Sequence, residues 1–484
     1  MSELITLTNL INGELRAPRA GRYLEVFEPA TGAVYARCPD SDLDDVADAV
    51  NAAQRAAPAW AATSPVERAA CMNRLADLIE ARLDEFVAAE SRDSGKPLSL
   101  ARAVDIPRAV SNLRFFAAAV QAWSSESHSM GGAINYTLRQ PLGVVGCISP
   151  WNLPLYLFTW KIAPALATGN AVVAKPSEVT PMTAWMLAQL VQQAGFPPGV
   201  LNILHGDGPR CGQAIVDHAQ VKAISFTGST RVGSAIAARA APKFKKLSLE
   251  LGGKNPSVVF EDWDDSEAAL DTLVRSAFSN QGQICLCGSR LLVQRSIYAK
   301  FRERFVARAQ ALCVGDPCDA SSQLGAIVSK VHFEKIQSCI ELALTEGGQI
   351  LCGGVAMHLD GRCAEGWFIA PTVIEGLGSE SRSNQEEIFG PVVSLIPFDD
   401  EAEALAIANS TGYGLAASVW TQNLSRAHRV AEGLESGIVW INCWMLRDLR
   451  TPFGGVKNSG VGREGGVEAL RFFTDAKNVC IALD

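Results

Sequence analysis

Hydrophobic residues recur at helical spacing in the first hundred residues of the chain. In residues 44–62 and 65–92, apolar side chains return every three or four positions, with charged residues between them. This period predicts two amphipathic helices, because one face of each can be buried while the other stays in water. The N-terminal part of the chain is therefore expected to be rich in helix.

From Gly143 onwards the pattern changes to short apolar runs that alternate with helical segments. The first runs are GVVGCIS, NAVVAK, VLNILHG and AISFTG, with a helix expected over residues 182–194. A second series follows residue 253, with NPSVVF, SRLLVQ and VVSLIPF as strands and SIYAKFRERFVARAQAL as a helix. Strands that alternate with helices favour parallel βαβ units. The pattern predicts an α/β protein with two doubly wound parallel sheets, divided near residue 253.

Length and composition agree with a large folded protein. The 484 residues are 48% hydrophobic and 19% charged, which is too apolar for a disordered chain. At roughly 150 residues per domain, this length favours two or three domains. Residues 141–160 carry no charge and have the length of a membrane span, but three prolines and the lysine that follows favour a buried strand and turn.

Charge and cysteine content indicate which binding partners and which cellular compartment to expect. The net charge is −8 and no long run of lysine and arginine is present, so nucleic acid is not expected as a partner. Thirteen cysteines without a C-x-x-C pair fit neither a zinc site nor a disulfide framework. Reduced thiols indicate a cytoplasmic protein. The segment MSELITLTNLING has no basic stretch followed by an apolar one, so no secretory signal is expected.

Three short segments carry residues that are unusual for a core or for a surface. Cys285 ends FSNQGQIC, a predicted tight loop; Glu250 lies between two leucines; and Asn152 lies in a loop with a proline on either side. Burial would raise the pKa of Glu250 and suit it to act as a base. The alternatives are a cysteine that fills space in the core, a solvated acid at a strand end, and an asparagine in a turn.

Together these segments resemble the signatures of the aldehyde dehydrogenase superfamily, E-L-G-G-K and F-x-x-x-G-Q-x-C, and the resemblance extends over nearly the whole chain. It implies two Rossmann-type domains, a small oligomerisation flap, and assembly as a homodimer or homotetramer. It divides the chain into an NAD-binding domain (1–122 and 142–253), a catalytic domain (254–435), the flap (123–141 and 468–484) and a substrate-tunnel segment (436–467).

The resemblance also implies catalytic roles that suit the chemistry of these residues. Cys285 would be the nucleophile, because a thiolate attacks an aldehyde carbon well and later leaves well from a thioester. The side-chain amide of Asn152 and the backbone N–H of Cys285 would bind the oxyanion. Glu250 would activate the water that hydrolyses the thioester. The sequence has no H-E-x-x-H motif or cluster of cysteine and histidine, so no metal is expected.

The cofactor that the resemblance implies is NAD. In place of G-x-G-x-x-G the chain has SFTGSTRVG, residues 225–233, which would present backbone N–H groups and the Ser229 hydroxyl to a pyrophosphate. The carboxylate of Glu178, in KPSE, would repel the additional phosphate of NADP. The residues assigned to the cofactor by resemblance are Ile148, Trp151, Lys175, Ser177, Glu178, Gly228, Ser229, Glu387 and Phe389.

Arginines in the expected substrate tunnel indicate an aldehyde substrate that carries a carboxylate. The segments NCWMLRDLRT, DIPR and WNLPL resemble those of 2-hydroxymuconic and 2-aminomuconic semialdehyde dehydrogenases within the superfamily. Arg447 and Arg108 would bind the distal carboxylate through bidentate hydrogen bonds. The alternatives are that Arg447 pairs with Asp448, for which Arg450 is the expected partner, and that Arg108 is a solvated helix charge. The apolar walls of the tunnel would be Leu157, Trp160 and Phe453.

Other activities stay open on the sequence alone. They are oxidation of an aliphatic aldehyde, an aminoaldehyde or betaine aldehyde, hydrolysis of an ester or thioester without NAD, and a non-catalytic protein on the same scaffold. A cationic aldehyde would need acids and aromatic rings where this chain has Arg447, which counts against betaine aldehyde. The loss of Cys285, Glu250 or Asn152 would indicate the non-catalytic protein, and all three are present.

Overall fold

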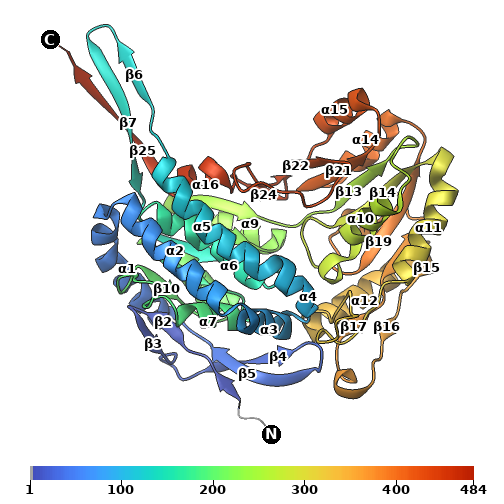
Figure 1. The fold of residues 1–484 in the computed structure, drawn as a ribbon, viewed down its shortest axis with the longest axis horizontal. Helices are drawn as coiled ribbons and strands as arrows, with labels where there is room; N and C mark the ends of the chain where they lie inside the picture. Colours follow the sequence, from blue (N-terminus) through green and yellow to red (C-terminus); the bar gives the residue numbers. More distant parts are fainter. Residues whose placement is uncertain (1–3, 484) are drawn as a thin grey trace.

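The computed structural model describes residues 4–483, which form two α/β lobes and a projecting arm (Figure 1). The predicted boundaries also include residues 1–3 and 484, which lie outside the described residues.

The N-terminal region is helical, as the hydrophobic spacing predicts, but one of the two expected helices is divided. α1 (Leu43–Ala62) and α2 (Pro65–Ala81) each begin with a capping box. The helix expected over residues 65–92 breaks at Arg82, whose ψ is +27°, and continues as α3 (Leu83–Ser94). Gly95, with φ +74°, ends α3 in the left-handed conformation that favours glycine. Helix α5 (Ile106–Ala122) packs against α2 and α6 (Pro154–Ala167).

An eight-stranded sheet forms the centre of the first lobe, in the order β24-β12-β11-β8-β9-β10-β2-β3. Strands β8 and β9 are buried along their whole length, which explains their continuous apolar runs. The chain passes from β8 to β9 and β10 on one side and returns with β11 and β12 on the other, so the strand order reverses between β8 and β11. The parallel strands are β8 (Val144–Ile148), β9 (Ala171–Lys175), β10 (Leu201–Ile203), β11 (Val221–Thr227) and β12 (Lys246–Glu250).

A seven-stranded sheet forms the second lobe, in the order β15-β18-β19-β14-β13-β21-β22. Alternate residues of β14 face different cores: Leu291 and Val293 pack with α10 (Glu267–Phe278) and α11 (Tyr298–Gln310), and Leu292 packs with α14 (Glu401–Asn409) and α15 (Leu424–Gly433). Both sheets are thus parallel in their main part and covered by helices, and the predicted fold class is confirmed. The strands are β13 (Asn255–Val259), β14 (Gly288–Gln294), β15 (Gln349–Cys352), β18 (Thr372–Glu375), β19 (Val392–Phe398), β21 (Ala416–Trp420) and β22 (Ile438–Ile441).

The arm is a three-stranded antiparallel sheet that extends away from both lobes (Figure 1). Its strands are β6 (Ser127–Met130), β7 (Ala133–Pro141) and β25 (Thr474–Ala482), so it joins segments from opposite ends of the chain. Three of its apolar side chains are strongly exposed, namely Met130, Leu138 and Ile481.

The remaining elements complete the two lobes. They are β1 (Ile5–Thr6), β2 (Asn9–Ile11), β3 (Glu14–Arg16), β4 (Tyr23–Glu28), β5 (Ala33–Pro39), α4 (Leu98–Leu100), a π-helix (Ala101–Asp105), α7 (Met182–Ala188), a second π-helix (Gly208–Gly212), α8 (Gln213–Asp217), α9 (Thr230–Ala240), α12 (Lys330–Thr345), β16 (Ala356–Met357), β17 (Phe368–Ile369), α13 (Arg382–Gln385), β20 (Tyr413–Gly414), β23 (Val456–Lys457), β24 (Gly460–Val461), α16 (Gly466–Phe472) and the 3₁₀ turns 241–243, 279–282, 295–297 and 361–363. The helix predicted over residues 182–194 is shorter than expected, because α7 ends at Ala188 and turns follow.

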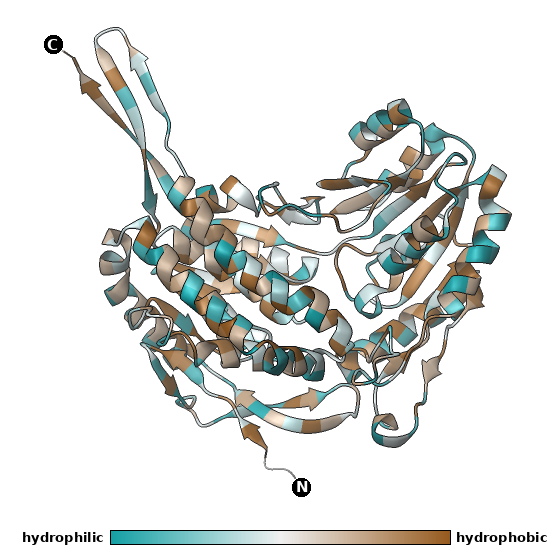
Figure 2. Cartoon of the chain, viewed as in Figure 1, coloured by the Kyte–Doolittle hydropathy of each residue, from teal (hydrophilic) through white to brown (hydrophobic). Residues whose placement is uncertain are grey.

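Hydrophobic residues gather on the strands, and many outward-facing helix positions are hydrophilic (Figure 2). The uncharged stretch 141–160 forms the buried strand β8, a turn and the start of α6, rather than one long helix. No helix within residues 4–483 has both the length and the hydropathy needed to cross a membrane. All thirteen cysteines are free thiols.

Candidate active site

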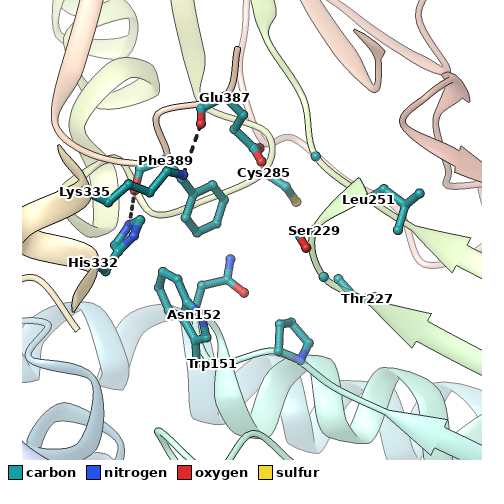
Figure 3. A pocket seen from close by; sticks show the side chains of 13 residues that line it. Trp151, Asn152, Thr227, Ser229, Leu251, Cys285, His332, Lys335, Glu387 and Phe389 are labelled. Atoms are coloured by element: carbon teal, nitrogen blue, oxygen red, sulfur yellow. Dashed lines mark hydrogen bonds between the residues drawn. The ribbon is translucent and has the colours of Figure 1, made fainter. Parts of the chain in front are cut away.

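A pocket of about 170 Å³ opens between the two large sheets. In the first lobe its residues follow the carboxyl ends of β8, β11 and β12, and in the second they precede β14 and β19. Ligands of open parallel sheets bind at the carboxyl ends of the strands where the strand order reverses, and the pocket lies at that point. It is lined by Pro150, Trp151, Asn152, Thr227, Gly228, Ser229, Leu251, Gly252, Cys285, His332, Lys335, Glu387 and Phe389 (Figure 3).

The loop that carries Cys285 has an unusual backbone conformation. Asn280 and Gln281 have φ of +53° and +56°, and Gly282 follows with φ of +70°. A side chain at Gly282 would place its Cβ 2.0 Å from the carbonyl oxygen of Gly390, so only glycine fits there. Such strained backbone persists only when the surrounding structure holds it, and it is common at active sites.

The Cys285 side chain points into the pocket and is half-buried (Figure 3). Burial raises the pKa of its thiol, Glu387 and Glu250 raise it further, and Arg447 lowers it. The thiol is therefore protonated at neutral pH in this arrangement, and formation of the thiolate requires a base. Its neighbour Cys287 is buried, and burial raises the pKa of that thiol to about 12.

Asn152 also points into the pocket, from the turn between β8 and α6 (Figure 3). Its Nδ2 donates one hydrogen bond to the carbonyl oxygen of Gln283, at 2.9 Å. A primary amide has two N–H donors, so one stays available to a ligand. The backbone carbonyl of Asn152 accepts from Lys96 Nζ at 3.1 Å and from Asn280 Nδ2 at 3.0 Å. Hydrogen bonds thus fix both the side-chain amide and the backbone of Asn152.

Glu250 lies at the end of β12, next to the pocket but not on its wall. It is only 3% exposed, and neither carboxyl oxygen has a hydrogen-bond partner among residues 4–483, so it is not a solvated acid. Burial and the nearby Glu464 raise its pKa. Glu464 in turn accepts from Lys161 Nζ at 2.8 Å and from the Ser225 hydroxyl at 3.1 Å.

The segment with which the chain replaces G-x-G-x-x-G joins β11 to α9, as expected for a strand-to-helix turn. Ser229 is the N-cap of α9, and its hydroxyl accepts from the backbone N–H of Val232 at 3.4 Å. The hydroxyl of Thr227 is buried without a hydrogen-bond partner. Gly228 and Ser229 line the pocket together with Trp151. This wall combines a helix N-terminus with free hydrogen-bonding groups.

Four of the predicted cofactor residues do not line the pocket. Ile148 ends β8 and Lys175 ends β9, while Ser177 and Glu178 follow β9, so all four lie at the same edge of the sheet. Lys175 Nζ donates to Glu178 Oε2 at 2.9 Å, and the Ser177 hydroxyl accepts from the backbone N–H of Val179 at 3.2 Å.

Glu387 and Phe389 reach the pocket from the loop before β19. Glu387 Oε1 accepts from the backbone N–H of Gly253 at 2.9 Å, and burial raises the pKa of this carboxyl group. Phe389, with φ +64°, packs edge-on against Trp151 with ring centroids 5.3 Å apart.

Two pocket residues on α12 were not expected from the sequence. A ring nitrogen of His332 contacts the carbonyl oxygen of Phe389 at 2.7 Å, and Lys335 Nζ donates to that of Glu387 at 3.2 Å (Figure 3). Burial lowers the pKa of His332 to about 4, so its imidazole is neutral. Neither residue belongs to a recognisable motif, and an isolated charge on an amphipathic helix gives no signal of a site.

The two arginines of the predicted tunnel come together around one tyrosine. Arg447 Nη1 donates to the Tyr156 hydroxyl at 2.9 Å, and its guanidinium lies 4.0 Å from the Phe453 ring centroid. Arg108 lies 5.4 Å from the Tyr156 ring centroid, and both guanidiniums lie within 5.9 Å of that of Trp160. The predicted wall residue Leu157 is the next residue of α6 and is buried.

Neither tunnel arginine forms an ion pair with any of residues 4–483. Asp448 pairs with Arg450 at 2.6 Å, as expected, and leaves Arg447 free. Arg108 is not a solvated helix charge, because its Nε and Nη2 are buried and have no hydrogen-bond partner in the part of the chain that the structure describes. Two buried or half-buried guanidiniums without a carboxylate form a site that favours an anion.

Comparisons with known proteins agree with this arrangement. A family model described as "Aldehyde dehydrogenase family" matches residues 16–479. The chain belongs to the aldehyde dehydrogenase family.

Relatives and solved structures within the aldehyde dehydrogenase family match the chain over its length. 2-Aminomuconic semialdehyde dehydrogenase of Danio rerio is 53% identical, covering 99% of this chain and 98% of its own. 2-Hydroxymuconic semialdehyde dehydrogenase of Pseudomonas sp. (strain CF600) is 47% identical, with 99% of both chains covered. The NAD+ complex of an aldehyde dehydrogenase from Bacillus cereus is 38% identical with a TM-score of 0.95, covering 99% of this chain and 97% of that one.

As an aldehyde dehydrogenase, the protein is an oxidoreductase that acts on aldehydes, which removes the non-catalytic protein from the alternatives. The structure brings Cys285, Asn152, Glu387 and Phe389 into one pocket and places Glu250 behind it. Tyr156, which joins the two arginines, was not expected from the sequence. It lies in α6, where every residue is buried, so its spacing in the sequence gives no signal of a site.

Proposed function

We propose that the protein oxidises, with NAD, a semialdehyde that carries a carboxylate, such as 2-aminomuconic or 2-hydroxymuconic semialdehyde. The observation that carries this proposal is the pair Arg108 and Arg447, which share Tyr156 and have no carboxylate partner in the described part of the chain. The names of the similar muconic semialdehyde dehydrogenases support the same substrate class.

The residues present fit NAD. The pyrophosphate would be held at the N-terminus of α9, where Ser229 caps the helix and the Thr227 hydroxyl is buried without a partner. Lys175 and Glu178 would hold the adenosine ribose, and Glu387 and Phe389 the nicotinamide ribose and ring. Ile148, Trp151, Ser177 and Gly228 complete the cofactor site. Bound NAD supplies the acceptor for the hydride that leaves the substrate carbon.

In the first chemical step the Cys285 thiol loses its proton to water. The thiolate attacks the aldehyde carbon, and a carbon–sulfur bond forms while the carbonyl oxygen becomes an oxyanion. The free N–H of Asn152 and the backbone N–H of Cys285 donate to that oxygen. Each such donor contributes on the order of 3 kcal/mol to transition-state stabilisation in comparable sites.

After oxidation the substrate is a thioester on Cys285, and Glu250 acts on it as general base. Its carboxylate takes a proton from water, the water oxygen bonds to the thioester carbon, and the thiolate leaves. Because neither oxygen of Glu250 is used in a protein hydrogen bond, both are free to accept from the water.

At the far end of the substrate, Arg108 and Arg447 bind the distal carboxylate, between apolar walls formed by Leu157, Trp160 and Phe453. Tyr156 adds a third donor. Its oxygen accepts from Arg447, so its own O–H is free to point to the anion.

The proposal extends to assembly and location. We assign residues 1–122 and 142–253 to NAD binding, 254–435 to catalysis and 436–467 to the substrate tunnel. Residues 123–141 and 468–484 would form the flap that covers a second copy in a homodimer or homotetramer. A reducing cytoplasm suits the free thiols of the chain.

The test compares kcat/KM with NAD for 2-hydroxymuconic semialdehyde and for hexanal, a neutral aldehyde of similar length. We expect a strong preference for the semialdehyde. Arg447→Met should raise its KM about 30-fold or more, because charge-assisted hydrogen bonds contribute about 2 kcal/mol or more. The KM for hexanal should stay within about twofold.

Arg450→Met, on the same loop but paired with Asp448, is the matched control. Equal effects on both aldehydes would not affect the family assignment. They would contradict the proposed carboxylate substrate and favour another aldehyde.

A further inference from the structure

Lys96 joins two segments that approach the site from different sides. Its side chain is completely buried, and Nζ donates to Asp105 Oδ1 at 2.9 Å and to the backbone carbonyl of Asn152 at 3.1 Å. Asp105 is the last residue of the π-helix that precedes α5, and Arg108 lies in the first turn of α5. One ammonium group therefore contacts both the segment of Asn152 and the base of the helix that carries Arg108.

A second buried carboxyl group completes the cluster. Glu90 is 0% exposed, and its two oxygens accept from the backbone N–H of Leu155 at 3.2 Å and from the Thr183 hydroxyl at 2.7 Å. Burial and Asp105 raise the pKa of Glu90. With Glu90 protonated, Lys96 and Asp105 form a neutral pair, which is the arrangement in which a buried ammonium is tolerated.

We propose that Lys96 is a positioning residue that fixes both the Asn152 amide over the reacting carbonyl and Arg108 against the distal carboxylate. The inference rests on the proposed roles of Asn152 and Arg108. Lys96 touches neither the pocket nor the ends of those side chains, so it acts through the backbone of one and the helix of the other. A short π-helix inside a longer helix is often found at functional sites, and here it places Asp105 under the ammonium.

Two consequences follow from this geometry. A small displacement of Asn152 weakens an interaction made in the transition state, so kcat falls for every aldehyde. A displacement of Arg108 weakens binding of the distal carboxylate, so KM rises for the carboxylate aldehyde alone. A purely structural lysine would lower the amount of active enzyme and change kcat by the same factor for both substrates, with no change in KM.

The experiment uses Lys96→Met and the double variant Lys96→Met/Asp105→Asn. The single variant leaves Asp105 buried without its cation and is expected to be unstable. The double variant removes both charges and keeps the fold testable. For it we expect a loss in kcat of at least about tenfold with hexanal, and an additional severalfold rise in KM with 2-hydroxymuconic semialdehyde. Lys96→Arg should restore part of the kcat.

Lys245→Met is the matched control, because Lys245 is also a buried lysine that donates to backbone carbonyls, those of Val216 and His218, and lies outside the site. It should leave kcat and both KM values within about twofold of the wild type.

A double-mutant cycle with Asn152→Ala separates the possible failures. If Lys96 acts through Asn152, the change at Lys96 and Asp105 lowers kcat by less than about twofold once Asn152 is alanine. A full tenfold loss in that background overturns the inference while the proposed role of Asn152 stands. A normal kcat in Asn152→Ala alone overturns the proposed oxyanion role, and the inference with it.

Discussion

Glu250 is a carboxyl group whose surroundings favour its protonated form. A general base must be ionised to act. Because the pKa is raised, activity should be lost on acidification at a higher pH than it would be with an ordinary glutamate. In the proposed mechanism, thioester hydrolysis slows below that pKa, where Glu250 is protonated. Above it the carboxylate is present and is a stronger base than a solvated glutamate.

Glu464 is one of the groups that raise this pKa, so its removal should move the pH profile. Glu464→Gln takes away a neighbouring negative charge and leaves Lys161 without its partner, and both changes favour the carboxylate of Glu250. We expect the acid limb of kcat against pH to shift to lower pH. Glu468→Gln, an exposed acid paired with Arg471, is the control and should not shift the limb. A limb that stays in place in Glu464→Gln would show that another group controls the step.

Candidate site residues that belong to motifs could be proposed from the sequence, whereas the residues that support them could not. Cys285, Glu250 and Asn152 have unusual neighbours in the sequence and belong to recognisable signatures. Tyr156 lies in the uninterrupted apolar run of α6, all of which is buried, so no periodicity indicates its direction. Lys96 follows a helix and a glycine, as many surface turn residues do, and only the tertiary structure shows that it is completely buried.

At the scale of elements, the loop from α10 to β14 sets the position of Cys285, the proposed nucleophile. Gly282 is its tightest point, as the left-handed φ of +70° and the approach to Gly390 show. Gly282→Ala should therefore lower the free energy of unfolding by about 2 kcal/mol or more and displace Cys285. We expect a lower Tm by differential scanning fluorimetry and a large loss of kcat. Gly131→Ala, where no atom lies within 4 Å of the added Cβ, should change neither. A fully active Gly282→Ala enzyme would contradict this account of the loop.

The strands were easier to predict than the ends of the helices. Strands such as β8, β9 and β13 are buried on both faces, so their apolar runs are continuous and distinct. The break between α2 and α3 occurs at Arg82, which is neither glycine nor proline. It results from a local change of backbone geometry that leaves the apolar spacing of the sequence intact.

At the scale of the whole molecule, the arm exposes apolar side chains to water. Met130, Leu138 and Ile481 are 60%, 40% and 47% exposed. A second copy of the chain that covers them would bury this surface and the edge strands of the arm.

Charged substitutions on the arm should therefore reduce the assembly. We expect Leu138→Lys/Ile481→Lys to have a lower molar mass than the wild type by size-exclusion chromatography with light scattering, at equal protein concentration. Leu43→Lys replaces a more exposed leucine, 71% accessible, on α1 and should leave the mass unchanged. An unchanged mass in the arm variant would exclude this surface from the contact between copies.

The acidic groups around Cys285 also bear on how a turnover ends. In the proposed reaction the aldehyde arrives at the thiol as a neutral group, and oxidation and hydrolysis convert it to an acid beside Glu250 and Glu387, which already raise the pKa of that thiol. The buried surroundings that raise the pKa of the Cys285 thiol also disfavour a carboxylate formed there, while the distal carboxylate is still attracted by Arg108 and Arg447. The product is thus destabilised only at the end that has reacted. Release is favoured by the charge that the reaction creates, so the dicarboxylate should compete weakly with fresh semialdehyde even though both share the same anchor.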